Sequence, residues 1–556
     1  MRTLRDKPLT ADIAFPALVR APAAIGKAHI CDLLAFAVLV LAAGVAVSIF
    51  RDYGLGWDDY AHAEYGERLV ALYASGFADR RALSFVNLYM YGGGFDLFSA
   101  LAAKVLPLGL FEVRRLAGAA VGLVGLVMTW RMGRRIGGPS AGLIALLLLV
   151  ACPIYVGHVF MNAKDGPFAV AMTVLLLGTI RVFEEYPQPS AGTTALFGLG
   201  LGLAVGTRVL GGFGVISAIS ALALLFAAEA RRQGLRDAAW RVGRFVAALA
   251  PALVLGYAIL AVVWPWAVVD PLNPLRAVKY FSRFFEEPWH ERFGGHLVSV
   301  IDMPRSYLPT LLALKLPELF LLLGFAGAAG AFVTIFRGDI PPSRRAVLLA
   351  VVLAAVLPIA ITIAARPAMY NGIRHFVFVL PPLAVLGGVA GAWLLERLPP
   401  RPARIFAAVA IAGIASPAIE MVRLHPYEYS HFNRIAGGVT AARANYMLDY
   451  WALSFKQASD ELAARIEKLG LKHPPDRPWK LAVCGPHRSP QVELGPEFET
   501  TWDPKGADFA MMLGEFYCLK FSAPLLVEIE REGAVYARVY DIRNRSYATL
   551  LTFPGL

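Results

Sequence analysis

The stretch CDLLAFAVLVLAAGVAVSIF, residues 31–50, is an apolar run long enough to cross a lipid bilayer as a helix. It is followed by GWDDYAH, residues 56–62, which holds two adjacent carboxylates, Asp58 and Asp59. Residues 59–75 then gather apolar side chains near one helical face, a pattern typical of a helix that lies along the bilayer surface. A carboxylate at this boundary could act as a general base on a substrate whose other half sits in lipid. It could equally belong to a solvated loop in which Asp59 caps the next helix.

The composition indicates a membrane protein throughout. The chain has 556 residues, of which 57% are hydrophobic and only 17% are charged, and its mean hydropathy is +0.56. The formal charge of +12 could suggest nucleic-acid binding, but the Lys and Arg residues fall in the short connections between apolar runs, as the positive-inside rule expects. We therefore interpret the basic charge as a sign of membrane topology and expect no nucleic-acid partner.

The apolar runs predict a polytopic α-helical membrane protein with about eleven spans, its N-terminus inside and its C-terminus outside. The spans are expected at 31–50, 114–131, 139–158, 167–183, 193–208, 211–229, 245–265, 311–336, 346–365, 375–394 and 404–422. This count treats residues 93–110 as a surface-lying or re-entrant helix of the first external loop. Counting them as a span would invert the remaining topology and place the Arg-rich connections outside.

Three regions follow from this topology: a cytoplasmic N-terminal segment at 1–30, a membrane domain at 31–424, and a small soluble extracytoplasmic α/β domain at 425–556. The soluble domain is expected to contain a helix over about 453–469 and strands near 480–484, 509–513, 525–529 and 535–540, with a hairpin turn at 531–533. Cys484 and Cys518 could pair if this domain faces an oxidising compartment.

Polar residues collect at distant points of the sequence that the predicted topology places on the external side. FMNAKDGP, residues 160–167, follows the third span, Arg208 follows the fifth, and YNGIRH, residues 370–375, precedes the tenth. A long loop after the seventh span adds His290. Acids, bases and cations that meet at one face of a membrane protein suit a site at the interface.

The candidate cations of this site are Lys164, Arg208 and Arg374. Together they could cradle a lipid-linked phosphate, because arginine can engage phosphate through two hydrogen bonds. Each also has a simpler explanation: Lys164 could form a salt bridge with the neighbouring Asp165, and the arginines could reach toward lipid headgroups.

A divalent metal is a further possibility. His62, His290 and His375 could bind one together with Asp58 or Glu287. No pair of them shows a recognised ligand spacing, so the sequence carries no specific metal signature.

These stretches resemble the GT-C superfamily of integral-membrane glycosyltransferases, and more closely the branch of the protein O-mannosyltransferases and the lipid A aminoarabinose transferases. The likeness rests on Asp58-Asp59 after the first span, on the stretches at 160–167 and 370–375, and on DMPRSYLP at 302–309. It covers nearly the whole membrane portion. The chain has Asp-Asp where much of the family has Asp-Glu.

The resemblance implies transfer of a sugar, with inversion, from a polyprenyl-phosphate carrier to an acceptor hydroxyl at the periplasmic face of a bacterial inner membrane. As a hypothesis, Asp58 acts as the general base, and Lys164, Arg208 and Arg374 bind and stabilise the departing donor phosphate. The remaining candidates are Asp59 and Asp165 for catalysis, and His62, Asn162, His290, Tyr370 and His375 for substrate contacts. The sugar stays open, and so does the acceptor, which could be a glycan, a glycolipid or a protein.

Two other functions fit parts of the sequence. A transporter or flippase of lipid-linked sugars would also handle polyprenyl phosphates and carry charged residues in the membrane. Against it, the sequence shows no inverted repeat or paired broken helices, and its polar residues gather at one interface. A non-catalytic scaffold that holds partners through the outer domain is the third alternative, and an Asp58→Ala substitution without effect would favour it.

Overall fold

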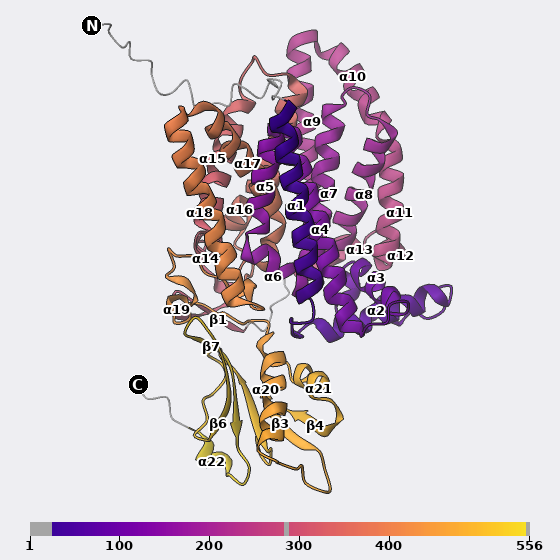
Figure 1. Ribbon diagram of the computed structural model, residues 1–556. Coiled ribbons are helices and arrows are strands. Elements are labelled where there is room, and N and C mark those ends of the chain that lie inside the picture. The colour runs from indigo at the N-terminus through magenta and orange to yellow at the C-terminus, as the bar shows by residue number, and fades with distance from the viewer. Residues whose placement is uncertain (1–24, 283–288, 552–556) are drawn as a thin grey trace, which may run out of the picture.

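The computed structural model describes residues 25–282 and 289–551. Figure 1 shows a bundle of long helices with a small sheet domain beyond one end of it. Of the predicted N-terminal segment, residues 1–24 lie outside the described residues. The predicted fold class, a polytopic helical protein with a small C-terminal α/β domain, is confirmed.

Each predicted span overlaps one helix or consecutive helices, and the predicted number of eleven spans stays a prediction. By length and composition, eight helical stretches within residues 25–282 and 289–551 could cross a membrane, or nine if the bent pair α5–α6 is one span. The eight stretches comprise α1 (Ile25–Ile49), α7 (Asp165–Glu184), α9 (Gly212–Gln233), α10 (Leu235–Ala248) with α11 (Ala250–Val263), α15 (Glu318–Ile335), α16 (Pro342–Ala365), α17 (Leu380–Arg397) and α18 (Pro400–Leu424). The pair α5 (Pro139–Val150) and α6 (Pro153–Met161) bends by 63°. The other predicted spans coincide with α4 (Leu110–Gly137) and the shorter α8 (Ala191–Thr207).

The segment at 93–110 contains α3 (Gly94–Ala103), which has only 10 residues. At 1.5 Å per residue it covers about 15 Å, roughly half of the hydrocarbon core, so it is too short to be a span by itself. Figure 1 places α3 near α2 (Asp59–Ala74), α12 (Pro265–Val269) and α13 (Asn273–Phe281), at the end of the bundle that faces the sheet domain.

The C-terminal domain is built on a five-stranded mixed sheet in the order β4-β3-β5-β7-β6. β3 (Trp479–Cys484) lies parallel to β4 (Phe498–Thr501) and β5 (Phe509–Leu513), whereas β7 (Ala534–Asp541) is antiparallel to β5 and β6 (Leu525–Arg531). The predicted helix is α20 (Ser454–Lys468), and its apolar face, Phe455, Ala458, Leu462 and Ile466, is buried. The sequence predicted this helix, four of the five strands and the hairpin, and missed β4 and α21 (Arg488–Leu494). Cys484 and Cys518 form a disulfide.

The sheet domain is fastened to the bundle by direct hydrogen bonds. Ser489 of α21 donates to the carbonyl of Leu55, in the loop between α1 and α2, at 2.5 Å. The hydroxyl of Tyr450 lies 3.1 Å from Nε2 of His158 on α6. Gly56 meets the indole of Trp451 so closely that a Cβ there would lie 1.9 Å from Cδ1 of the ring. The acidic loop after the first helix therefore packs directly against the C-terminal part of the chain.

Candidate active site at the domain junction

Two residues that are distant in sequence form the centre of the site. Asp58 precedes α2 and Lys164 precedes α7, and Nζ of Lys164 lies 3.1 Å from Oδ2 of Asp58. The Asp58 side chain is 37% exposed and that of Lys164 is 14% exposed. Burial alone would raise the pKa of Asp58, but the charges of Lys164 and Arg374 outweigh it and lower this pKa to about 2. Lys164 thus pairs with Asp58 and not, as the simpler interpretation expected, with Asp165.

Asp165 takes its place through the turn that opens α7. Asn162 accepts hydrogen bonds from the backbone N–H groups of Lys164 and Asp165, at 2.9 and 2.7 Å, and its amide donates to Oδ2 of Asp165 at 2.7 Å. On the other side, Nη2 of Arg208 lies 2.8 Å from Oδ1 of Asp165. Asp165 and Arg208 are both buried, so the pair is shielded from solvent.

Arg374 is a buried cation with hydrogen-bonding capacity to spare. Its guanidinium lies over the rings of Tyr370 and Trp451, at 4.7 and 4.8 Å from their centroids. Within the described part of the chain, Nε and Nη1 of Arg374 have no hydrogen-bond partner. Because a buried donor without a partner is costly, such a group is well suited to receive an anion.

Tyr91 lies close to two of the three candidate cations. Nζ of Lys164 and the guanidinium carbon of Arg208 lie 5.1 and 5.6 Å from the centroid of its ring. The next residue, Gly92, donates its N–H to the carbonyl of Thr207 at 3.1 Å. A Cβ at Gly92 would lie 1.7 Å from the carbonyl oxygen of Gly206, so only glycine permits this approach. Tyr91 belongs to none of the motifs that predicted the site, although the run of glycines after it is typical of a close backbone contact.

Asp59 points to different partners from its neighbour Asp58. It is buried, and its two oxygens accept hydrogen bonds from Arg115 of α4 at 3.1 and 2.8 Å. It also accepts the N–H of Gly56 at 2.7 Å. α2 begins at Asp59, and Asp58, at the N-cap position, makes no side-chain capping bond. Asp59 therefore ties the loop between α1 and α2 to α4, and it does not cap the helix, as one of the two interpretations of the sequence proposed.

His62 is enclosed in a second buried ion network. Its Nδ1 lies 2.7 Å from Asp96 of α3, and Asp96 also pairs with Arg114 of α4 at 2.7 Å. All three side chains are at most 3% exposed. The network joins α2, α3 and α4 behind the site. The partners of His62 could not be predicted from the sequence, because Asp96 lies in an apolar run and Arg114 was assigned to a span end.

Of the remaining candidates, Tyr370 and His375 adjoin Arg374, whereas His290 lies at the surface. Tyr370 meets His375 edge to face at 4.9 Å, and it meets Trp289 at 5.2 Å. His290 is exposed at the start of β1 (His290–Phe293), opposite Ser299 of β2 (His296–Ser299). Across residues 25–282 and 289–551, no three His, Cys, Asp or Glu side chains gather as a metal site, and Glu287 lies outside these ranges.

Comparison with known proteins supports the motif-based resemblance. Residues 95–266, which include Lys164, Asp165 and Arg208, match the family model described as dolichyl-phosphate-mannose-protein mannosyltransferase. No curated protein matches the sequence.

Three solved structures illustrate the fold likeness. ArnT from Cupriavidus metallidurans bound to undecaprenyl phosphate is 19% identical, covers 94% of this chain and 100% of its own, and gives a TM-score of 0.46. The Archaeoglobus fulgidus oligosaccharyltransferase tethered with an acceptor peptide is 15% identical, with coverage of 85% and 64% and a TM-score of 0.48. The mycobacterial arabinofuranosyltransferase AftD is 14% identical, with coverage of 83% and 31% and a TM-score of 0.41. On the family match and the motifs, this multi-pass membrane protein is similar to the GT-C glycosyltransferases of the mannosyltransferase branch.

Proposed function

We propose that the protein transfers a sugar, with inversion, from a polyprenyl-phosphate carrier to an acceptor hydroxyl. The observation that carries this proposal is Arg374, a buried guanidinium with two nitrogens that lack partners among the described residues. Lys164 and Arg208 lie around the shared ring of Tyr91 and supply further positive charge. A phosphate held here would have its polyprenyl tail along the apolar helices of the bundle.

The reaction needs one base and one set of cations. The acceptor oxygen attacks the anomeric carbon as its proton passes to Asp58. The bond from the anomeric carbon to the phosphate oxygen breaks, and the carrier leaves as a polyprenyl phosphate. Negative charge grows on that phosphate in the transition state, where Arg374 and Lys164 would stabilise it. Asp165 would act through Arg208, with which it pairs at 2.8 Å.

The Asp58–Lys164 pair implies an order of events. A carboxylate whose pKa is about 2 is a weak base, since efficient general bases have pKa values nearer the working pH. A donor phosphate would compete with Asp58 for Lys164 and add its own negative charge nearby. Both effects raise the pKa of Asp58. We therefore infer that donor binding activates the base, and that the acceptor loses its proton only after the donor is in place.

We place this reaction at the periplasmic face of a bacterial inner membrane. The Arg-rich connections between the spans favour an inside N-terminus by the positive-inside rule. The disulfide Cys484–Cys518 supports an oxidising surrounding for the C-terminal domain, because such bonds persist outside the cytoplasm. The site lies at the junction with this same domain.

Binding of undecaprenyl phosphate to the protein in nanodiscs tests the cation site directly. Arg374→Gln is expected to weaken binding about tenfold or more, because a charge-assisted contact is lost. The matched control is Arg276→Gln on α13, an exposed arginine that pairs with Asp270. Equal affinities of the wild type and Arg374→Gln would overturn the proposal.

A further inference from the structure

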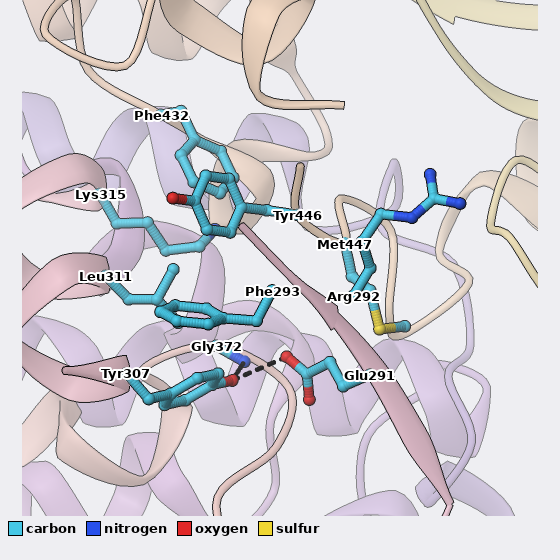
Figure 2. Close-up of a pocket in the computed structure, with 10 residues that line it drawn as sticks. All are labelled: Glu291, Arg292, Phe293, Tyr307, Leu311, Lys315, Gly372, Phe432, Tyr446 and Met447. Atoms are coloured by element: carbon cyan, nitrogen blue, oxygen red, sulfur yellow. Dashed lines mark hydrogen bonds between the residues drawn. The ribbon is translucent and has the colours of Figure 1, made fainter. Parts of the chain in front are cut away.

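The stretch that carries Arg374 is fastened by a buried acid from another part of the chain. Glu291 of β1 is 3% exposed, and its Oε2 accepts the backbone N–H of Asn371 at 2.6 Å. Its Oε1 accepts the hydroxyl of Tyr307, from α14 (Tyr307–Lys315), at 2.7 Å. The Tyr307 hydroxyl in turn accepts the N–H of Gly372 at 3.0 Å. Figure 2 shows Glu291 and Tyr307 converging on Gly372.

The backbone at this point needs such support. Asn371 and Gly372 have φ angles of 56° and 68°, so two consecutive residues occupy the left-handed region. Glycine adopts this conformation freely, whereas Asn371 does so at some cost. The contacts of Glu291 and Tyr307 fix the N–H groups of both residues. Tyr370 directly precedes this left-handed pair, and Arg374 follows it after one residue. The turn therefore sets how the Arg374 guanidinium lies over the Tyr370 ring.

The surroundings of Glu291 supply neutral donors at its two oxygens. Lys315, which lines the same cavity of about 10 Å³, directs its ammonium to the carbonyls of Tyr429 and His431, both at 3.4 Å. That ammonium also lies 4.1 Å from the centroid of the Phe432 ring. The carboxylate of Glu291 is therefore available to the turn, with both of its oxygens engaged there.

We propose that Glu291 is a positioning residue for donor binding: its ionised carboxylate holds the 371–372 turn and thereby keeps the Arg374 guanidinium aimed at the donor phosphate. This inference rests on the proposed function of Arg374. An ionised carboxylate accepts two hydrogen bonds, one at each oxygen. In a protonated carboxyl group, or in the amide of glutamine, one of the two acceptors becomes a donor and the negative charge is gone. The hydrogen bond that Tyr307 donates must then reverse, the bond from the Asn371 N–H loses its charge assistance, and the turn loosens.

The inference makes donor affinity depend on pH. Burial raises the pKa of Glu291 to about 7, although the bonds from Tyr307, Asn371 and Gly372 favour the ionised form. The titratable and charged groups that face Glu291 are Tyr307 and Lys315 of α14, Arg374, and Tyr450 and Glu515 of the C-terminal part. Below about pH 7 the wild type protonates Glu291 and comes to resemble Glu291→Gln.

The test is the affinity for undecaprenyl phosphate in nanodiscs, measured from pH 5.5 to 8.5 for the wild type and Glu291→Gln. We expect the Kd of the variant to be about tenfold higher at pH 8, with the ratio of the two Kd values falling toward one at pH 5.5. The titration of the phosphate itself affects both proteins equally and cancels in this ratio. Lys315→Gln, which alters the charged neighbour of Glu291 in the same cavity, serves as the control: it must keep the pH dependence that Glu291→Gln loses.

The outcomes separate this inference from the proposed function. A Kd ratio of one at every pH, or a ratio that stays constant with pH, would overturn the positioning role of Glu291. If Arg374→Gln weakens binding and Glu291→Gln does not, only this inference fails. If Arg374→Gln itself binds undecaprenyl phosphate as tightly as the wild type does, both the proposed function and this inference fail. Thermal unfolding, measured in parallel, shows whether each variant is folded under the conditions of the binding experiment.

Discussion

The ammonium of Lys164 lies 3.1 Å from the carboxylate of Asp58, and this pair joins the loop between α1 and α2 to the turn that opens α7. This contact places a positive charge against the proposed base. A single cation therefore has two competing partners, the base and the donor phosphate.

Lys164→Gln should reduce kcat/KM about a hundredfold, because it removes a cation that the departing phosphate needs. It should also change the pH profile. The pKa of Asp58 is about 2 with Lys164 present, so the free enzyme keeps this base ionised throughout the practical range. Without Lys164 this pKa rises, and kcat/KM should fall at acidic pH where the wild type shows no such fall from Asp58. Lys104→Gln, which alters an exposed pair with Glu67, is the control. Identical profiles would contradict the pairing argument.

Asp59→Asn should act on stability. The substitution breaks a buried ion pair and leaves Arg115 without its anion, which costs about 3–5 kcal/mol in comparable cases. Asp58→Asn, at a partly exposed position, should cost much less. Thermal unfolding in detergent measures both, and Asp270→Asn provides an exposed ion pair for reference. A larger loss of Tm for Asp58→Asn than for Asp59→Asn would show that the two roles are exchanged.

Gly92→Ala should damage both folding and activity, since its Cβ would lie 1.7 Å from the Gly206 carbonyl oxygen. The loop would have to move away from α8 and carry Tyr91 with it. Gly212→Ala is the matched control, because a Cβ there meets nothing within 4 Å. We expect a clear fall in Tm and turnover for the first variant and wild-type values for the second. Wild-type behaviour of Gly92→Ala would mean that this close contact is absent in solution.

The buried Glu291 should also leave a signature in stability. Its pKa is raised by burial from 4.5 in the unfolded chain to about 7 in the folded protein. The folded state therefore binds this proton more tightly, and the resulting stabilisation is present at low pH and is lost as the pH rises through about 7. The free energy of unfolding of Glu291→Gln, relative to that of the wild type, should therefore increase as the pH rises from 5 to 8. A stability difference that does not change over this range would contradict the assignment.

The sequence was informative where a pattern repeats and weak where two similar residues differ only in their partners. Apolar runs located the helices, and alternation located most of the C-terminal strands. The motifs at 160–167 and 370–375 also predicted that Asp58, Lys164 and Arg374 share one face. Yet nothing in the sequence separates Asp58 from Asp59, because the distinction depends on Arg115 of α4.

Other features depend on long-range contacts of the same kind. Glu291 lies far in sequence from the Asn371–Gly372 turn that it holds, and its role follows only from the packing of β1 against α14 and that turn. Tyr91 likewise gains its position near Lys164 and Arg208 from a backbone contact between Gly92 and the end of α8. β4 was missed because it is a four-residue strand at the edge of its sheet, too short for a clear alternating pattern.

The most direct measurement is sugar transfer by the purified protein from a panel of polyprenyl-phosphate sugars to a membrane-lipid extract. It compares the wild type with Asp58→Asn and with Glu64→Gln, a control on the exposed side of α2. The account predicts transfer by the wild type and the control, and none by Asp58→Asn, which should still bind undecaprenyl phosphate. Transfer that survives in Asp58→Asn would contradict Asp58 as the base. No transfer from any donor, together with movement of sugar lipids across proteoliposomes that survives the substitution, would contradict the transferase itself.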